Sequence, residues 1–314
     1  MNRREMLITS AGLLSTAVVG RTSQAAAIRD LPFTMDLCPG RIGVQASQAE
    51  TIQLAGEFGF TSVQPFAETV GLASDTEREA FRQMLKERNL VWGAADLPVP
   101  LNRDEESFQA AIARLPDIAR GLQKAGVTRI STWLDPRHAS LTYRANFDRH
   151  VRWIREIATI FKEHDMRLGL EYVGTKTLWT QQKYPFIHTM AESKELFDAV
   201  GTGNVGFVLD SWHWTMAEES VSDVRSLSNE EIVAVDLNDA PGGIPLDQQL
   251  DGRRGLPAST GVIDLRGFLQ ALVDINYDGP VRAEPFDQQL NAMDDEIAVE
   301  KTAAAMKKAF SLLG

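Results

Sequence analysis

Short apolar runs alternate with helical or less regular segments along most of this 314-residue chain, and this alternation constrains the fold more than any other feature. The apolar runs predict eight strands, at 33–38, 61–65, 90–95, 127–133, 167–173, 205–209, 232–237 and 279–284. Amphipathic spacing predicts helices at 47–58, 74–88, 105–125, 146–164, 189–200, 265–275 and 296–313, and a less regular segment, 216–229, follows the sixth strand.

Alternating strand and helix units predict a parallel sheet. Eight such units favour an α/β fold of the (β/α)8 TIM-barrel type, for which ~250 residues are typical. The chief alternative is a doubly wound open sheet, but the glycine-rich GxGxxG turn that usually opens such a fold does not follow the first strand. Because no Ser/Gly/Pro-rich linker divides the units, we expect residues 28–314 to form a single domain.

The first 27 residues have the pattern of an export signal. Arg3 and Arg4 precede a mildly apolar stretch, 7–20, and the alanines at 25–27 offer a small-residue cleavage site. This pattern resembles a twin-arginine signal peptide, and the alternatives are an ordinary secretory signal or a frayed tail. The apolar stretch is shorter than the ~20 residues of a membrane-spanning helix. We therefore expect a periplasmic or otherwise exported protein with no membrane association after signal removal.

Charge and cysteine content exclude two classes of function and structure. The formal net charge of −11 argues against a nucleic-acid partner, because nucleic-acid binding depends on basic surfaces. A single cysteine, Cys38, rules out an intramolecular disulfide, and its position at the end of an apolar run predicts a small buried residue.

Four apolar runs end in an acidic residue. The acids are Glu171, Asp210, Asp236 and Glu284, and the apolar runs of the last four predicted strands end at them. Parallel strands bring their C-terminal ends to one rim, where barrels of this type carry their active sites. One such acid alone is more often a helix cap or a solvated charge, but four mutually repelling carboxylates need a cation to hold them together. Oxygen ligands favour a divalent metal ion, Mn²⁺ or Mg²⁺.

Two of these acids are also the candidate catalytic groups. Glu171 and Glu284 belong to the fifth and eighth strands, so we expect them to approach a substrate from opposite sides and to transfer protons as a carboxylate pair. His213, three residues after Asp210, is a candidate to bind a substrate oxygen or the metal. The alternative for His213 is structural packing between its tryptophan neighbours.

Two further side chains are candidate substrate-binding residues. Arg254 lies in the longest loop, 238–261, where its guanidinium could hold a substrate hydroxyl or phosphate, although an arginine in solvent fits the pattern equally. Trp133 lies at the end of the fourth strand, where it could stack on a sugar ring or pack as part of the core or a lid.

Several segments together resemble one known group, the xylose isomerase-like TIM-barrel superfamily of sugar phosphate isomerases and epimerases. The resemblance covers residues 33–312. It rests on LGLEYVG at 168–174, VLDSWHW at 208–214, VDLNDAP at 235–241, RGLPASTGVIDL at 254–265 and YDGPVRAEPF at 277–286. It implies a divalent metal held by residues 171, 210 and 284 with a further ligand at 236, proton transfer by Glu171 and Glu284, and substrate oxygens bound by His213 and Arg254.

The chain departs from that family pattern at two positions. The family ligand at position 236 is usually histidine, whereas this chain has Asp236, which leaves Asn238 or Asp239 as alternative ligands. The loop that carries Arg254 reads Pro-Ala-Ser-Thr-Gly where relatives often have Pro-Gly-Glu-Gly.

The expected function is that of a divalent-metal-dependent sugar isomerase or epimerase. The resemblance implies proton transfer next to a carbonyl, through a metal-stabilised enediolate, on a small sugar or polyol ketone. The alternative in the same superfamily is a metal-dependent lyase or hydratase acting on keto-sugars or 3-keto-glycosides. A DNA-repair endonuclease and a non-catalytic sugar-binding barrel are less favoured. The sequence leaves open the sugar, the metal and the formation of a homo-oligomer.

Overall fold

The computed structural model describes residues 31–314, and its central element is a sheet of parallel strands. The order of its strands is β3-β2-β1-β11-β10-β9-β7-β5-β4. Their bounds are β1 Thr34–Leu37, β2 Ser62–Val63, β3 Val91–Trp92, β4 Ala95–Asp96, β5 Arg129–Trp133, β7 Arg167–Glu171, β9 Val205–Asp210, β10 Ile232–Leu237 and β11 Pro280–Ala283.

The two ends of this strand order belong to one continuous piece of chain. β3 pairs with β2 and β4 pairs with β5, and only Gly93 and Ala94 separate β3 from β4. The sheet therefore closes on itself with β3 and β4 as the two halves of one strand, which confirms the predicted TIM barrel. A Cβ atom at Gly93 would lie 2.3 Å from Oδ1 of Asp36, so only glycine gives that carboxylate room. The third strand, predicted as continuous over 90–95, is divided at this point.

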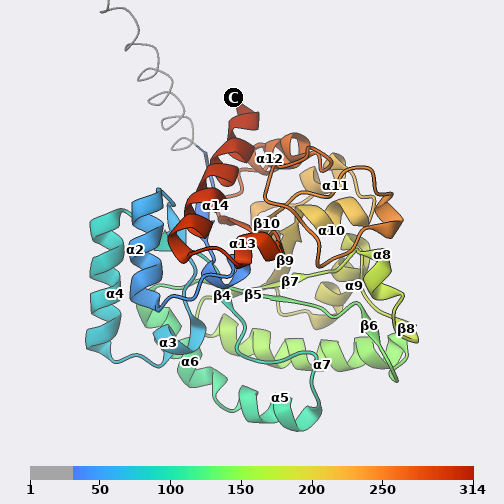
Figure 1. Ribbon diagram of the computed structural model, residues 1–314. Helices are drawn as coiled ribbons and strands as arrows, with labels where there is room; N and C mark the ends of the chain where they lie inside the picture. Colours follow the sequence, from blue (N-terminus) through green and yellow to red (C-terminus); the bar gives the residue numbers. More distant parts are fainter. Residues whose placement is uncertain (1–30) are drawn as a thin grey trace, which may run out of the picture.

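Helices surround the strands on the outside of the barrel (Figure 1). The α-helices are α2 Gln48–Phe58, α3 Ala67–Gly71, α4 Asp75–Arg88, α5 Glu105–Ile112, α6 Leu115–Ala125, α7 Tyr143–Lys162, α8 Lys176–Trp179, α9 Met190–Val200, α10 Ser211–Met216, α11 Val221–Arg225, α12 Leu265–Asp274, α13 Gln288–Asn291 and α14 Asp295–Phe310. Four short 3₁₀ segments are η1 Pro39–Ile42, η2 Asn229–Glu231, η3 Leu246–Gln248 and η4 Ser311–Leu313.

Local sequence signals explain most helix boundaries. Ser47 and Ser74 each form a capping box at the start of α2 and α4. The single helix predicted over 105–125 is wrong, because the chain forms α5 and α6 with a break between them. Pro116 lies in the first turn of α6, where its missing N–H is tolerated, whereas inside one continuous helix it would remove a hydrogen bond.

Side-chain alternation along the strands separates the outer core from the barrel interior. On β9, Phe207 packs outward against Phe197 of α9, while Val208 faces inward and joins Ala94 and Ala234 in a small apolar cluster. Along β9 and β10 the next inward-facing residues after Val208 and Ala234 are acids. The strands thus carry a thin apolar layer in the barrel and place their carboxylates directly above it.

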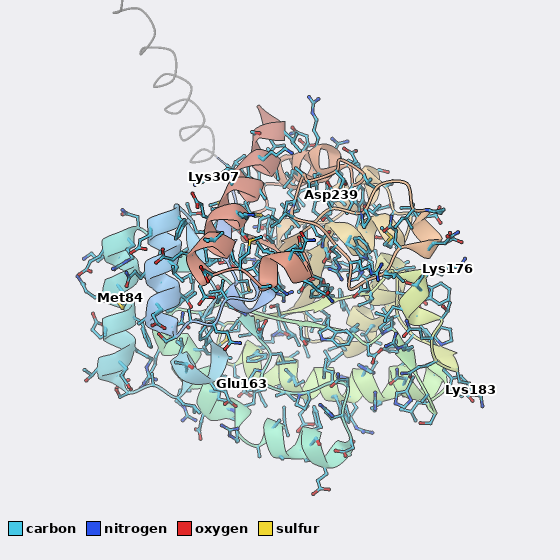
Figure 2. The ribbon with its side chains drawn as sticks, viewed as in Figure 1. Met84, Glu163, Lys176, Lys183, Asp239 and Lys307 are labelled. Atoms are coloured by element: carbon cyan, nitrogen blue, oxygen red, sulfur yellow. The ribbon has the colours of Figure 1, made fainter. Side chains whose placement is uncertain are left out.

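Two long loops cover the rim at the C-terminal ends of the strands. The segment 174–185 contains α8 and the short strand β8 (Tyr184–Pro185), which pairs antiparallel with β6 (Arg137–His138). The segment 238–261 contains η3, and Lys176 of α8 (Figure 2) reaches Asp247 of that loop at 3.5 Å. The two loops therefore contact each other above the barrel.

The expected export signal, residues 1–27, lies outside the described residues. Within residues 31–314, none of the helices combines the length and the apolar character that crossing a membrane requires.

Candidate metal centre

The four acids predicted from the strand ends meet at the C-terminal rim of the barrel. Glu171 and Asp210 are the last residues of β7 and β9, Asp236 lies in β10, and Glu284 directly follows β11. Each offers a carboxylate oxygen, these four oxygens all lie within 4.8 Å of one another, and all four side chains are buried. In the strand order β9 and β10 separate β7 from β11, so Glu171 and Glu284 reach the cluster from different sides.

Asp210 is held in place by the start of α10. Its Oδ1 accepts hydrogen bonds from the backbone N–H groups of Trp212 at 2.5 Å and His213 at 3.4 Å, as the N-cap of that helix. Nδ2 of Asn238 donates to both Asp210 oxygens, at 3.1 and 3.2 Å. These contacts fix the carboxylate and leave Oδ2 turned toward the other acids.

Three arginines supply positive charge to the same cluster. Nη1 of Arg254 donates to Oδ2 of Asp210 at 2.8 Å and to Oε2 of Glu284 at 2.7 Å. Arg41, from η1, forms an ion pair with the other oxygen of Glu284, Oε1. Arg282, from β11, forms a two-pronged ion pair with Asp236. The carboxylates are thus partly offset by guanidinium groups of the chain itself.

Arg254 is oriented by its own loop and by aromatic rings. Its Nη2 donates to Oδ1 of Asp251 at 2.8 Å, and Asp251 also accepts from Oγ1 of Thr175 at 2.9 Å. The guanidinium carbon lies 4.4 Å from the ring centre of Phe286 and 5.4 Å from that of Trp212. The side chain is buried, so the alternative of an arginine in solvent is wrong.

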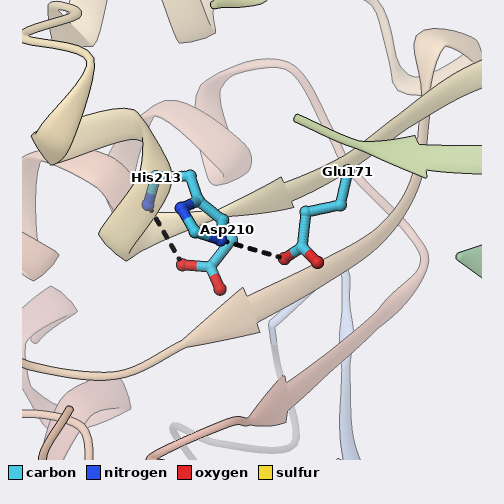
Figure 3. A group of neighbouring side chains, drawn as sticks. All are labelled: Glu171, Asp210 and His213. Carbon is cyan, nitrogen blue, oxygen red and sulfur yellow. Dashed lines mark hydrogen bonds and ion pairs between the residues drawn. The ribbon is translucent and has the colours of Figure 1, made fainter. Parts of the chain in front are cut away.

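His213 borders the same cluster rather than packing only between its tryptophan neighbours. Figure 3 shows its ring between Asp210 and Glu171, and its Nε2 lies 4.0 Å from Oε1 of Glu171. Burial, reinforced by Arg254, lowers the pKa of His213 to about 4, so the ring is neutral at pH 7. Because arginine only donates, the 3.0 Å contact with Nη2 of Arg254 makes Nε2 the acceptor. Glu171, Asp210 and His213 form a second possible metal-binding group.

The donors present fit a divalent metal ion. Oε1 of Glu171 is buried and accepts no hydrogen bond from residues 31–314. Burial, together with the negative charges of Asp210 and Asp236, raises the pKa of Glu171 well above its usual value. A buried carboxyl among like charges either keeps its proton or takes a cation, and carboxylate oxygens with an imidazole are ligands that Mn²⁺, Mg²⁺ and Zn²⁺ accept.

Asn238 and Asp239, the alternative ligands near position 236, do not offer free oxygens to this cluster. Asn238 turns its amide N–H group toward Asp210. Asp239 (Figure 2) accepts backbone hydrogen bonds from Ala240, Thr260, Gly261 and Ile263, and it thereby closes the loop that carries Arg254. These two residues therefore have structural roles.

A cavity of about 560 Å³ opens above the carboxylates, and its wall includes every candidate substrate-binding residue. His213 and Arg254 border its charged side. Trp133, paired in register with Glu171 on the neighbouring strand, is 44% exposed, and Phe286 is 36% exposed. The cavity therefore offers charged groups at its floor and aromatic surface at its mouth, the combination that small-molecule sites use.

Sequence reasoning missed four charged residues of the centre, Arg41, Asp251, Arg282 and the buried Asp36. Arg282 had a visible signal, because it interrupts an apolar run two residues before Glu284 and so shares the inward face of β11. The other three lie in or beside segments whose contacts depend on the closed barrel.

Known proteins with related sequences include sugar isomerases and epimerases. The chain is 25% identical over 166 residues to an inosose isomerase of Halalkalibacterium halodurans, a match that spans 52% of this chain and 56% of that protein's length. It is 25% identical over 228 residues to a D-psicose 3-epimerase of Enterocloster bolteae, which covers 69% of each protein.

Solved structures show the same fold. A xylose isomerase domain protein from Alicyclobacillus acidocaldarius is 30% identical and superposes with a TM-score of 0.78, covering 89% of this chain and 99% of the other. The IOLI protein with a bound zinc atom superposes with a TM-score of 0.72 at 18% identity, covering 89% and 98%. The family model described as xylose isomerase-like TIM barrel matches residues 52–309. With its closed parallel barrel and the acids at its rim, the chain belongs to the xylose isomerase-like TIM-barrel family.

Proposed function

We propose that this protein is a divalent-metal-dependent isomerase or epimerase of a small sugar or polyol ketone. The observation that carries the proposal is the convergence of four buried carboxylate oxygens within 4.8 Å at the floor of a cavity that a small molecule can enter. The activities named for the related inosose isomerase and D-psicose 3-epimerase support the reaction class. Manganese and magnesium are the metals that the oxygen-rich donor set favours.

A divalent metal held by these acids would polarise the substrate carbonyl and stabilise the enediolate that forms when the neighbouring C–H bond loses its proton. The chain's own residues would do the rest. Glu284 removes a proton from the carbon next to the carbonyl on one face, and Glu171 delivers a proton from the other side. The reverse reaction exchanges the two roles.

The surroundings of the two glutamates differ in the way that an acid–base pair requires. Both oxygens of Glu284 are bound by arginines, Arg41 and Arg254. Glu171 has an oxygen without a partner among the described residues and a pKa raised by burial. Two carboxyl groups whose environments push their proton affinities apart can divide the roles of base and acid between them.

The residues around the pair bind and orient the substrate in this proposal. Neutral His213 holds a substrate oxygen through a ring nitrogen, and Arg254, which lies beside it on the same side of the cavity, donates to a second oxygen. The indole of Trp133, at the mouth, stacks on the carbon face of the sugar. These contacts place the carbon that loses its proton between Glu284 and Glu171.

The test is proton exchange in D₂O. Purified protein supplied with Mn²⁺ is incubated with a panel of keto-sugars and inososes, and NMR follows deuterium entry at the carbon next to the carbonyl. We expect exchange with retention of the carbon skeleton, and we expect Glu284→Gln to slow it by roughly 10²- to 10⁴-fold while the protein stays folded. Exchange at the wild-type rate in folded Glu284→Gln would show that this carboxylate is not the base.

Elimination is a second candidate reaction, because the cavity has room for the larger substrate that it would need. A volume of about 560 Å³ with exposed Trp133 and Phe286 at the mouth falls in the range that holds ligands larger than one sugar ring. A keto-glycoside would place its ring above the carboxylates and its substituent against the aromatic side chains. Loss of the substituent or of water in the same NMR experiment would identify a lyase, whereas an intact skeleton identifies an isomerase.

We also propose that residues 1–27 direct export by the twin-arginine route. Arg3 and Arg4 before the apolar stretch 7–20 support this proposal. The paired substitution Arg3→Lys/Arg4→Lys keeps the charge and should retain the protein in the cytoplasm. Fractionation of the two proteins checks the result, and export of the paired variant at the wild-type level would contradict it.

A further inference from the structure

Asp236 differs from the other three acids of the cluster in what holds it. Both of its oxygens are bound by one guanidinium group, with Nε of Arg282 on Oδ1 and Nη2 on Oδ2, the latter at 3.0 Å. Both side chains are fully buried. Two parallel N–H···O contacts from one planar group form the most directional ion pair that proteins use.

The strand register of the barrel brings Asp236 and Arg282 together. In the register between β10 and β11, Asp236 lies directly opposite Arg282, so the two side chains leave neighbouring strands at the same level. The remaining nitrogen of Arg282, Nη1, donates to Oγ of Ser131 on β5 at 3.2 Å. Arg282 is therefore held on two sides of the barrel, and it cannot release Asp236 by the turning of a loop.

The other three acids lack a two-pronged partner on a neighbouring strand. Oε1 of Glu171 accepts no hydrogen bond from the described residues. Oδ2 of Asp210 and Oε2 of Glu284 both accept from the Nη1 amino group of Arg254, and Oδ2 of Asp210 also accepts from Nδ2 of Asn238. Both donor residues lie in the loop 238–261 rather than in a strand. Glu171, Asp210 and Glu284 thus differ from Asp236 in having one oxygen whose position is not set by a neighbouring strand.

We propose that the metal in this cluster is ligated by Glu171, Asp210 and Glu284, and that Asp236 is the counter-ion of Arg282 rather than a ligand. The inference rests on the proposed function, because it assumes that a metal binds here. The buried pair ties β10 to β11 two residues before Glu284. A site with three carboxylate ligands carries one negative charge less than the four-acid site that the spacing of the acids suggests.

Metal affinity tests the assignment without any assay of activity. Mn²⁺ is titrated calorimetrically into the metal-free wild type, into the double variant Asp236→Leu/Arg282→Met, and into the matched ligand variants Glu171→Gln and Asp210→Asn. The double variant removes the pair and both buried charges together. We expect the Kd of the double variant for Mn²⁺ to stay within about threefold of the wild-type value. Each ligand variant should lose more than about 100-fold in Mn²⁺ affinity, because removal of a residue that only hydrogen-bonds to a metal ligand already costs about 10- to 100-fold.

The visible spectrum of bound Co²⁺ gives an independent readout, because its bands depend on which atoms ligate the ion. Asp236→Asn keeps the shape of the side chain and removes its charge. This variant replaces the double variant in the test if the double variant does not fold. We expect the Co²⁺ bands to be unchanged in Asp236→Asn and altered in Asp210→Asn, with folding of each protein checked by circular dichroism.

The outcomes separate the two proposals. Loss of Mn²⁺ affinity in the folded double variant, or altered Co²⁺ bands in Asp236→Asn, would make Asp236 a ligand and overturn this inference. Failure of the wild type itself to bind Mn²⁺ or Co²⁺ would instead refute the proposed function.

Discussion

At the scale of single residues, the centre depends on buried charges that are matched to one another. Asp236 and Arg282 show the consequence most clearly, because both are fully buried. Replacement of Asp236 by Asn leaves the Arg282 charge without its counter-ion, which typically costs about 3–5 kcal/mol. We expect this loss in the free energy of unfolding of Asp236→Asn, measured by urea denaturation.

The double variant is the control for that prediction. Asp236→Leu/Arg282→Met removes both charges, and apolar replacement of a buried ion pair is often neutral or stabilising. We expect it to recover most of the stability that the single variant loses. Equal losses in the two proteins would show that packing, rather than the unpaired charge, is responsible.

At the scale of elements, the division of the third strand depends on one glycine. A Cβ atom added at Gly93 would meet both oxygens of Asp36, at 2.3 and 2.5 Å. Overpacking of this kind costs about 1–3 kcal/mol, so Gly93→Ala should lower the unfolding free energy by about that amount. Adding Asp36→Ser should restore part of the loss, because the shorter side chain vacates the space. If the two substitutions have independent effects in urea, the contact is not the cause.

A second prediction at this scale concerns α7 and the pH dependence of stability. Burial lowers the pKa of His150 to about 4, while its Nδ1 bonds to the carbonyl oxygen of Asn146 at 2.8 Å. The unfolded chain binds a proton below pH ~6.5, whereas the folded chain does not until pH ~4. The stabilising contribution of the neutral ring is therefore fully present above pH ~6.5 and is lost as the pH falls toward ~4.

The measurement is the unfolding free energy of wild type and His150→Gln between pH 7.5 and pH 4. The wild type should lose about 3 kcal/mol more than the variant over this range, as a pKa difference of this size implies. Parallel pH profiles for the two proteins would show that His150 does not control this slope.

At the scale of the whole molecule, metal binding and folding should be linked. The four acids come from β7, β9, β10 and β11, so one bound ion would connect strands that are far apart in the sequence. A metal that binds only the folded barrel, present at about 100 times its Kd, adds about 2.7 kcal/mol to stability. We expect Mn²⁺ to raise the Tm of the chelator-treated protein by several degrees in a calorimetric scan.

The same scan has a matched control. Glu171→Gln and Asp210→Asn should show little or no rise in Tm at that Mn²⁺ concentration, since both have lost a charged ligand. An equal rise in these variants would place the ion elsewhere on the protein.

Local sequence patterns were enough to predict the barrel and the meeting of its four acids. A short apolar run predicts a buried strand, and the C-terminal ends of parallel strands all lie at one rim of a barrel. Residues 171, 210, 236 and 284 could therefore be grouped from the sequence alone. The break between α5 and α6 could also have been predicted from Pro116, because the effect of a proline on a helix is local.

Which charged side chains pair with one another could not be predicted in this way, because the pairing depends on the closed barrel. Asp236 and Arg282 are 46 positions apart in the sequence, and the pairing of β10 with β11 brings them into register. Arg41 reaches Glu284 only because β1 lies beside β11 in the closed barrel. The interruption of the third strand at Gly93 likewise depends on the close approach of Asp36 from another strand. Such contacts depend on strand register and closure, which are properties of the whole fold, whereas runs of apolar residues and their ends are properties of the chain alone.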